Sequence, residues 1–168
     1  HALTLGFLAM VMLGALMQML PVVAGSTLPA PRSVAWFSHM SLAAGTIALM
    51  ASFLTAEPAV YRIASLLLGG GFAVFLAAAA ISLARAVSGV TVRGMRLAVI
   101  GLAVTLLLGL ALALLRAVHW APPIIKAASA AHVAFGLLGW VLMLVIGVAY
   151  LVFGAMVFHH LIGMQYIR

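Results

Sequence analysis

One uninterrupted apolar stretch, from Ala130 to Gly154, limits the folds that this chain can adopt. It reads AAHVAFGLLGWVLMLVIGVAYLVFG and contains no acidic residue, lysine or arginine. A helix over this stretch is long enough to cross the hydrocarbon core of a bilayer, which needs about 20 apolar residues. Because lipid offers no hydrogen bonds to the backbone, such a segment predicts an α-helix and excludes an open sheet.

Further apolar runs predict an all-α fold, a polytopic transmembrane helix bundle of about five spans. The chain is 68% hydrophobic and only 5% charged, which leaves too few polar side chains to cover a soluble domain. We expect residues 1–168 to form a single domain, whose start at His1 fits either a lost leader or a segment of a longer chain. The predicted spans are residues 2–25, 36–54, 63–84, 97–118 and 124–158.

The formal charge of +7 comes from eight lysines and arginines against one acid, Glu57. These basic residues stand singly between apolar runs, a pattern typical of membrane topology and of contact with anionic lipid, so no nucleic-acid partner is expected. One side of the membrane receives Arg32, Arg85, Arg93, Arg96 and Arg168, and the other receives Arg62, Arg116 and Lys126. This bias predicts cytoplasmic first and third loops, an outward-facing His1 and a multi-pass protein of the bacterial inner membrane.

A line of small residues follows His132 on one face of the fifth predicted span. Helical steps of three and four lead from His132 to Gly136, Gly139, Met143 and Gly147. Small residues let a second helix or a flat cofactor approach the backbone, and helix packing is their usual role. An imidazole inside a membrane usually faces the protein interior and marks a ligand site or a pathway. We predict that this face is buried against protein or cofactor.

The histidines offer candidate ligands for a membrane-embedded haem, which takes one or two imidazoles from facing helices. His132 lies about 13 Å beyond Pro123 along a helix, and His1 falls toward the same membrane face. We predict both as metal ligands, with Gly136 and Gly139 opening room for the porphyrin. His39, on the opposite side, is a third cofactor-binding candidate. Solvated histidines are expected at His119, His159 and His160.

Other chemistry finds little support in the sequence. No cysteine is present, which excludes disulfides, iron–sulfur clusters and thiolate metal sites from this chain. The predicted spans contain no carboxylate for a hydrolytic metal site or a proton relay. No nucleophile elbow or phosphate-binding loop occurs, so no catalytic residue is predicted.

The first and fifth predicted spans share a faint internal similarity. Leu5-Gly6-Phe7 resembles Leu138-Gly139-Trp140, and each copy follows a histidine. The histidines lie five residues before the first glycine of one copy and seven before that of the other. In α-helices this unequal spacing places the two imidazoles on different faces.

Two stretches resemble known membrane haemoproteins. HALTLGFLAMVMLGALMQMLPVVAG and AAHVAFGLLGWVLMLVIGVAYLVF are similar to helices of bacterial proteins related to haem-copper oxidase subunit I, and to parts of the NnrS family of haem-containing proteins linked to nitric oxide stress. The resemblance covers about a third of the chain and implies that His1 and His132 are haem ligands. The oxidase pattern also has many more spans, a histidine-proline-glutamate copper motif and a late His-x-His pair, which this chain lacks. Oxygen reduction by this chain alone is therefore not expected.

Two hypotheses follow. The first is an integral membrane protein of a respiratory or nitric-oxide-related redox system that binds haem b and, if part of an enzyme, belongs to an oxidoreductase. The second is a structural subunit without cofactor, whose glycine faces dock onto a larger membrane complex. Both place the chain among membrane lipids and other membrane subunits. An absorption spectrum of the purified protein distinguishes the two hypotheses, because only the first predicts a Soret band.

Overall fold

The computed structural model describes residues 1–165, with side chains up to Phe158, and these residues contain helices and no strand. Five helices are long and apolar enough to cross a membrane, as predicted. The first span is a π-helical segment, η1 (Thr4–Ala9), continued by α1 (Met10–Val23). The middle spans are α2 (Pro31–Thr55), α3 (Pro58–Arg85) and α4 (Val90–Ala117). The fifth is built from α5 (Ile125–Ala134), the π-helical η2 (Phe135–Leu142) and α6 (Met143–Gln165).

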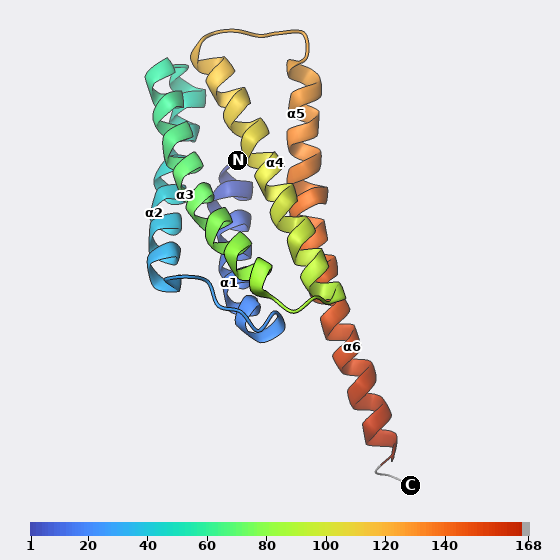
Figure 1. Cartoon of the computed structure of the whole chain (residues 1–168). Helices are drawn as coiled ribbons and strands as arrows, with labels where there is room; N and C mark the ends of the chain where they lie inside the picture. Colours follow the sequence, from blue (N-terminus) through green and yellow to red (C-terminus); the bar gives the residue numbers. More distant parts are fainter. Residues whose placement is uncertain (166–168) are drawn as a thin grey trace.

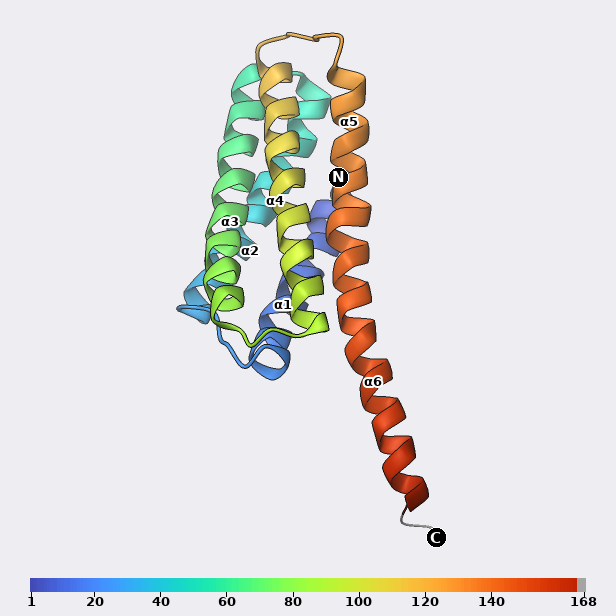
Figure 2. The ribbon, with the colours of Figure 1, turned by 45° about the vertical axis from the view of Figure 1, so that its right-hand side comes forward.

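The spans alternate in direction and form one bundle (Figure 1). The first and fifth spans therefore run the same way, and the N-terminus lies part-way along the bundle rather than at its end. The fifth span is the longest, and α6 projects well past the other helices (Figure 2). From Tyr150 to Phe158 its side chains are exposed.

Three helices begin earlier than the apolar runs indicated. The helices α2, α3 and α4 start at Pro31, Pro58 and Val90, not near Trp36, Ile63 and Leu97. Hydropathy marks the part of a helix that lies in lipid, whereas proline, with its fixed φ and missing N–H, suits the first helical turn of α2 and α3. The helix α4 begins directly after Gly89. These helices therefore extend beyond the predicted spans at their N-terminal ends.

Arg96 shows one consequence of the earlier start of α4. It lies inside this helix, and its guanidinium donates to the carbonyl of Leu83 at 2.8 Å and to that of Ala86 at 3.4 Å. These carbonyls end α3, where a cation is favoured by unpaired carbonyls and by the helix dipole. Arg96 thus holds the α3–α4 turn together.

The packing of α2 against α3 depends on small side chains. Ser38 donates through Oγ to the carbonyl of Gly71 at 3.1 Å, and Ser41 donates to that of Leu67 at 2.7 Å. A Cβ atom at Gly45 would come within 2.8 Å of Leu68 Cγ. The two helices are therefore closely packed, and α3 runs without a break through the consecutive glycines Gly69, Gly70 and Gly71.

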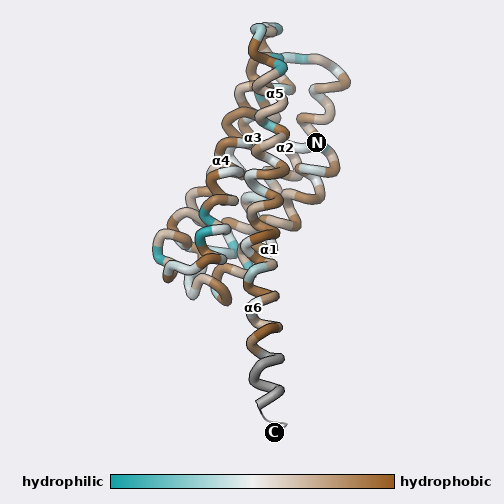
Figure 3. Tube along the Cα trace, turned by 90° about the vertical axis from the view of Figure 1, so that its right-hand side faces the viewer, coloured by the Kyte–Doolittle hydropathy of each residue, from teal (hydrophilic) through white to brown (hydrophobic). Residues whose placement is uncertain are grey.

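Large apolar side chains cover the outside of the bundle. Leu66 is 76% exposed and Leu107 is 68% exposed, although both lie in the middle of their helices. Hydrophobic colour dominates the spans, and hydrophilic residues gather near the turns (Figure 3). An apolar exterior of this kind is suited to contact with lipid rather than with water. The chain is a polytopic helical membrane protein.

Candidate cofactor site

The structure brings His1 and His132 together from the first and fifth spans. Their ring centroids lie 6.0 Å apart, and the ring planes differ by 24°. The two spans have the same direction, so both histidines lie in the N-terminal part of their spans and in the same half of the bundle. Among the described residues, η1 packs on α2, and it makes no extensive contact with η2. The imidazoles therefore meet across two helices that are otherwise apart.

The His132 ring is oriented by α4. Its Nδ1 lies 3.0 Å from the carbonyl oxygen of Thr105. A carbonyl can only accept, so Nδ1 donates this hydrogen bond, and in the neutral ring Nε2 keeps its lone pair. The ring rests against Gly109, one turn along α4, where a Cβ atom would come within 2.8 Å of His132 Cε1. Thr105 and Gly109 together hold His132 with Nε2 available as a ligand.

An aromatic and cationic border lies beside His1. The ring of Phe53 is 5.5 Å from that of His1 and 5.9 Å from that of Tyr61. Arg116 places its guanidinium carbon 5.9 Å from the centre of the Phe53 ring. Aromatic rings and a guanidinium stabilise one another at such distances. This border links the ends of α2, α3 and α4 to the histidine pair.

A π-helical segment follows each of the two histidines. The segment η1 begins at Thr4 and η2 at Phe135, in each case three residues after the histidine. π-Helical segments are rare in proteins, and those that occur are often found at functional sites. Each histidine thus lies at the same distance before its π-helical segment, whereas the glycines of the similar sequence pairs, Gly6 and Gly139, lie five and seven residues after the histidines.

Two buried polar atoms beside these π-helical segments have no hydrogen-bond partner in the described part of the chain. They are Trp140 Nε1, within η2, and Thr46 Oγ1. Thr46 faces η1, since a Cβ atom at Gly6 would lie 3.5 Å from Thr46 Cγ2. Buried polar groups without a partner are uncommon in proteins. Both are donors that a bound group or water can use.

The small-residue face of the fifth span packs against α4, as predicted, with Gly147 buried and the rest of the face half-buried. A Cβ atom at Gly136 would lie 3.3 Å from Thr105 Cγ2, and one at Gly147 would lie 3.4 Å from Gly94 Cα. Gly139 is in contact with Gly101. The space beside Gly136 and Gly139 is thus filled by α4, and the room predicted there for a porphyrin is taken by a helix. These glycines serve helix packing.

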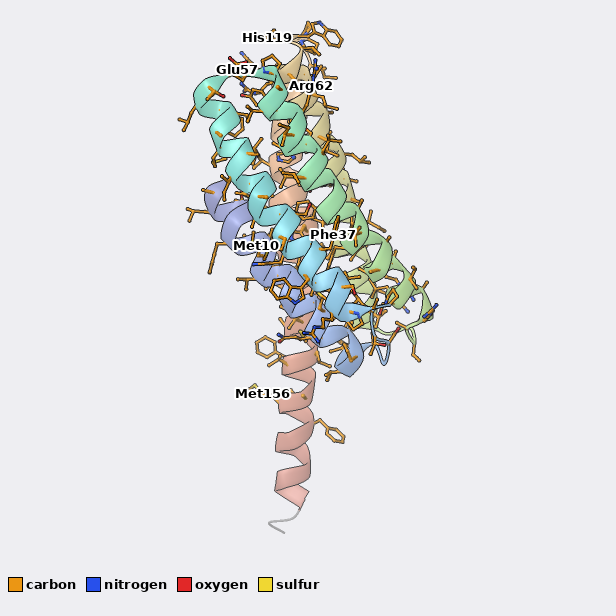
Figure 4. All side chains as sticks on the ribbon, turned by 90° about the vertical axis from the view of Figure 1, so that its left-hand side faces the viewer. Met10, Phe37, Glu57, Arg62, His119 and Met156 are labelled. Atoms are coloured by element: carbon orange, nitrogen blue, oxygen red, sulfur yellow. The ribbon has the colours of Figure 1, made fainter. Side chains whose placement is uncertain are left out.

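The remaining histidines lie apart from the pair. His39 is exposed on α2, about 21 Å along that helix from Phe53. His119 is exposed in the turn between α4 and α5, at the end of the bundle shown uppermost in Figure 4, where Glu57 and Arg62 also lie. The side chains of His159 and His160 lie outside the described residues. His1 and His132 are the two predicted ligands that the fold unites.

The sequence analysis did not predict that α4 packs on the glycine face of the fifth span and orients His132. Gly94, Gly101 and Gly109 recur seven and eight residues apart, about two turns each, and so form a line that matches the fifth span. That spacing was a usable signal for a packing face. The Thr105 carbonyl carried no signal, because every residue has a backbone carbonyl.

Comparison with protein-family models, with curated proteins and with solved structures gives no match to this chain.

Proposed function

We propose that this chain is an integral membrane protein that binds haem b, with His1 and His132 as the two ligands of the iron. The observation that carries the proposal is the 6.0 Å separation of their ring centroids. The two rings are stacked in this structure, and both would hold the iron when the group is bound. Two histidines from facing helices are a usual ligand set for a haem in a helical bundle.

The hydrogen bond to Thr105 supports the same role. A metal-binding histidine almost always donates its other ring N–H to a carbonyl, a carboxylate or water, which fixes the ring and raises its basicity as a ligand. His132 already makes this bond through Nδ1 at 3.0 Å. The bound group would supply one-electron exchange at iron, and the protein would orient it and limit its contact with water.

The proposed setting is a respiratory or nitric-oxide-related redox system of the bacterial inner membrane. The resemblance of the first and fifth spans to oxidase-related and NnrS-like helices supports it. No catalysis is assigned to this chain alone. Other membrane subunits are proposed as partners, since α6 offers an apolar surface with exposed side chains from Leu151 to Phe158.

An absorption spectrum of the purified chain tests the haem. We expect a Soret band in the wild type, and we expect His132→Ala to lose or strongly shift it because one iron ligand is removed. His119→Ala is the matched control, because His119 is exposed and away from the pair. Circular dichroism should show unchanged helix content in both variants.

The competing function is a structural subunit without cofactor. The glycine face of the fifth span favours it, because that face is fully explained by packing on α4. A wild type without a Soret band after expression with ample haem supply would establish this alternative, and so would a His132→Ala spectrum identical to that of the wild type.

A further inference from the structure

A cavity of about 310 Å³ opens between the first span and α2, in the half of the bundle away from the histidine pair. Its floor includes Phe75 of α3, which is fully buried. Gly14 lines one wall, and a Cβ atom there would meet nothing within 4 Å. Figure 4 shows Met10, another lining residue, where α1 and α2 lie alongside each other. The volume matches that of small-molecule sites, which begin at about 300 Å³.

The polar chemistry of the cavity comes from His39. Its imidazole is exposed at the rim, and no hydrogen-bond partner for it is found within the described residues. Ser38 also lines the cavity, but its hydroxyl already donates to the Gly71 carbonyl at 3.1 Å. A ligand therefore meets apolar walls and one imidazole with two free nitrogens, which can donate to an oxygen or accept from a hydroxyl.

The apolar walls favour an aromatic ring. Trp36 and Phe75 contribute aromatic side chains, and Met10 and Met17 contribute thioethers, which contact aromatic rings favourably. His39 lies about 12 Å along α2 from Pro31, so the cavity faces the membrane. Trp36 at its rim is 60% exposed. A ligand would enter sideways from the lipid.

We infer that this cavity binds a membrane-soluble, planar six-membered ring that carries a carbonyl or hydroxyl oxygen, the chemistry of a quinone or quinol headgroup. His39 hydrogen-bonds the oxygen, and the ring lies among Trp36, Phe75 and the two methionines. This site does not depend on the haem proposal, because its residues are separate from His1 and His132.

Tryptophan fluorescence tests the site, since Trp36 stands at its rim. The full chain in phosphatidylcholine nanodiscs is titrated with duroquinone, alone and in competition with durene, a tetramethylbenzene that lacks both oxygens. We expect saturable quenching by duroquinone. Gly14→Leu, which fills the cavity, and His39→Leu, which removes the hydrogen bond, should each weaken binding roughly tenfold or more. Gly70→Leu is the matched control, because a Cβ atom at Gly70 also meets nothing within 4 Å and Gly70 does not line the cavity.

Three results would overturn the inference. Quenching that is linear and equal in the wild type and Gly14→Leu would show partition into lipid alone. Competition by durene as strong as self-competition by duroquinone would show a site that ignores the oxygen. Unchanged affinity in His39→Leu would remove His39 from the recognition. None of these results alters the Soret test, so the two proposals fail separately.

Discussion

The absence of a side chain at Gly109 decides where the His132 imidazole can lie. The ring fills the space that a Cβ atom would occupy, and it reaches the Thr105 carbonyl from there. At this scale the sequence identified the two imidazoles that the fold brings together, because histidine in an apolar span is costly and conspicuous. It could not identify Thr105 or Gly109, since one acts through its backbone and the other through missing atoms.

Gly109→Ala should therefore disturb the histidine and leave the fold intact. The added methyl group comes within 2.8 Å of a ring atom at the end of a side chain, and that ring can turn away. We expect a shifted Soret band or lowered haem content, with normal helix content and thermal stability. Gly70→Ala makes the same chemical change in open space and should leave the spectrum as it is. An unchanged spectrum in Gly109→Ala would contradict this account of His132.

At the scale of helices, hydropathy predicted the five spans but not the residues at which the helices begin or the π-helical winding within them. Proline positions set the start of α2 and α3, and packing rather than composition distinguishes η2 from the α-helices beside it. The apolar pattern also could not predict which helix packs on the glycine face of the fifth span. It required matching two lines of small residues, on α4 and on the fifth span, and nothing in hydropathy pairs one helix with another.

The contact between Gly101 and Gly139 gives the prediction at this scale. A Cβ atom at Gly101 would overlap the backbone C and O atoms of Gly139, which cannot move aside as a side chain can. We expect Gly101→Ala to destabilise the bundle by about 1–3 kcal/mol, the usual cost of overpacking. Thermal unfolding in detergent measures the loss. Gly70→Ala again serves as the control, and equal melting temperatures for the two variants would refute the packing.

For the whole molecule, the turns separate the basic residues as the sequence indicated. Arg32 and Arg85 lie near the turns at one end of the bundle, whereas Arg62 and Arg116 lie toward the other end. The excess of positive charge at the first end predicts that this end faces the cytoplasm. With that orientation the histidine pair would lie in the outer half of the membrane and the His39 cavity in the inner half.

The absence of native cysteines makes this orientation easy to test. Ser88→Cys lies in the turn between α3 and α4, and Ala121→Cys lies in the turn between α4 and α5. In intact cells a membrane-impermeant maleimide should label Ala121→Cys, and Ser88→Cys only after the cells are opened. The reverse pattern would invert the topology.

The two π-helical segments let each histidine-bearing span hold an extra residue without changing the faces of the helix on either side. A π-helical turn contains about one residue more than an α-helical turn, because its hydrogen bonds run to the fifth residue instead of the fourth. Deleting one residue from η2 would let the span wind as a plain α-helix. The extra residue and the wide turn would be lost together, so Gly147 would stay on Gly94 and His132 would stay near Thr105. A one-residue deletion that left η2 wound as it is would instead turn His132 by about 100° about the helix axis.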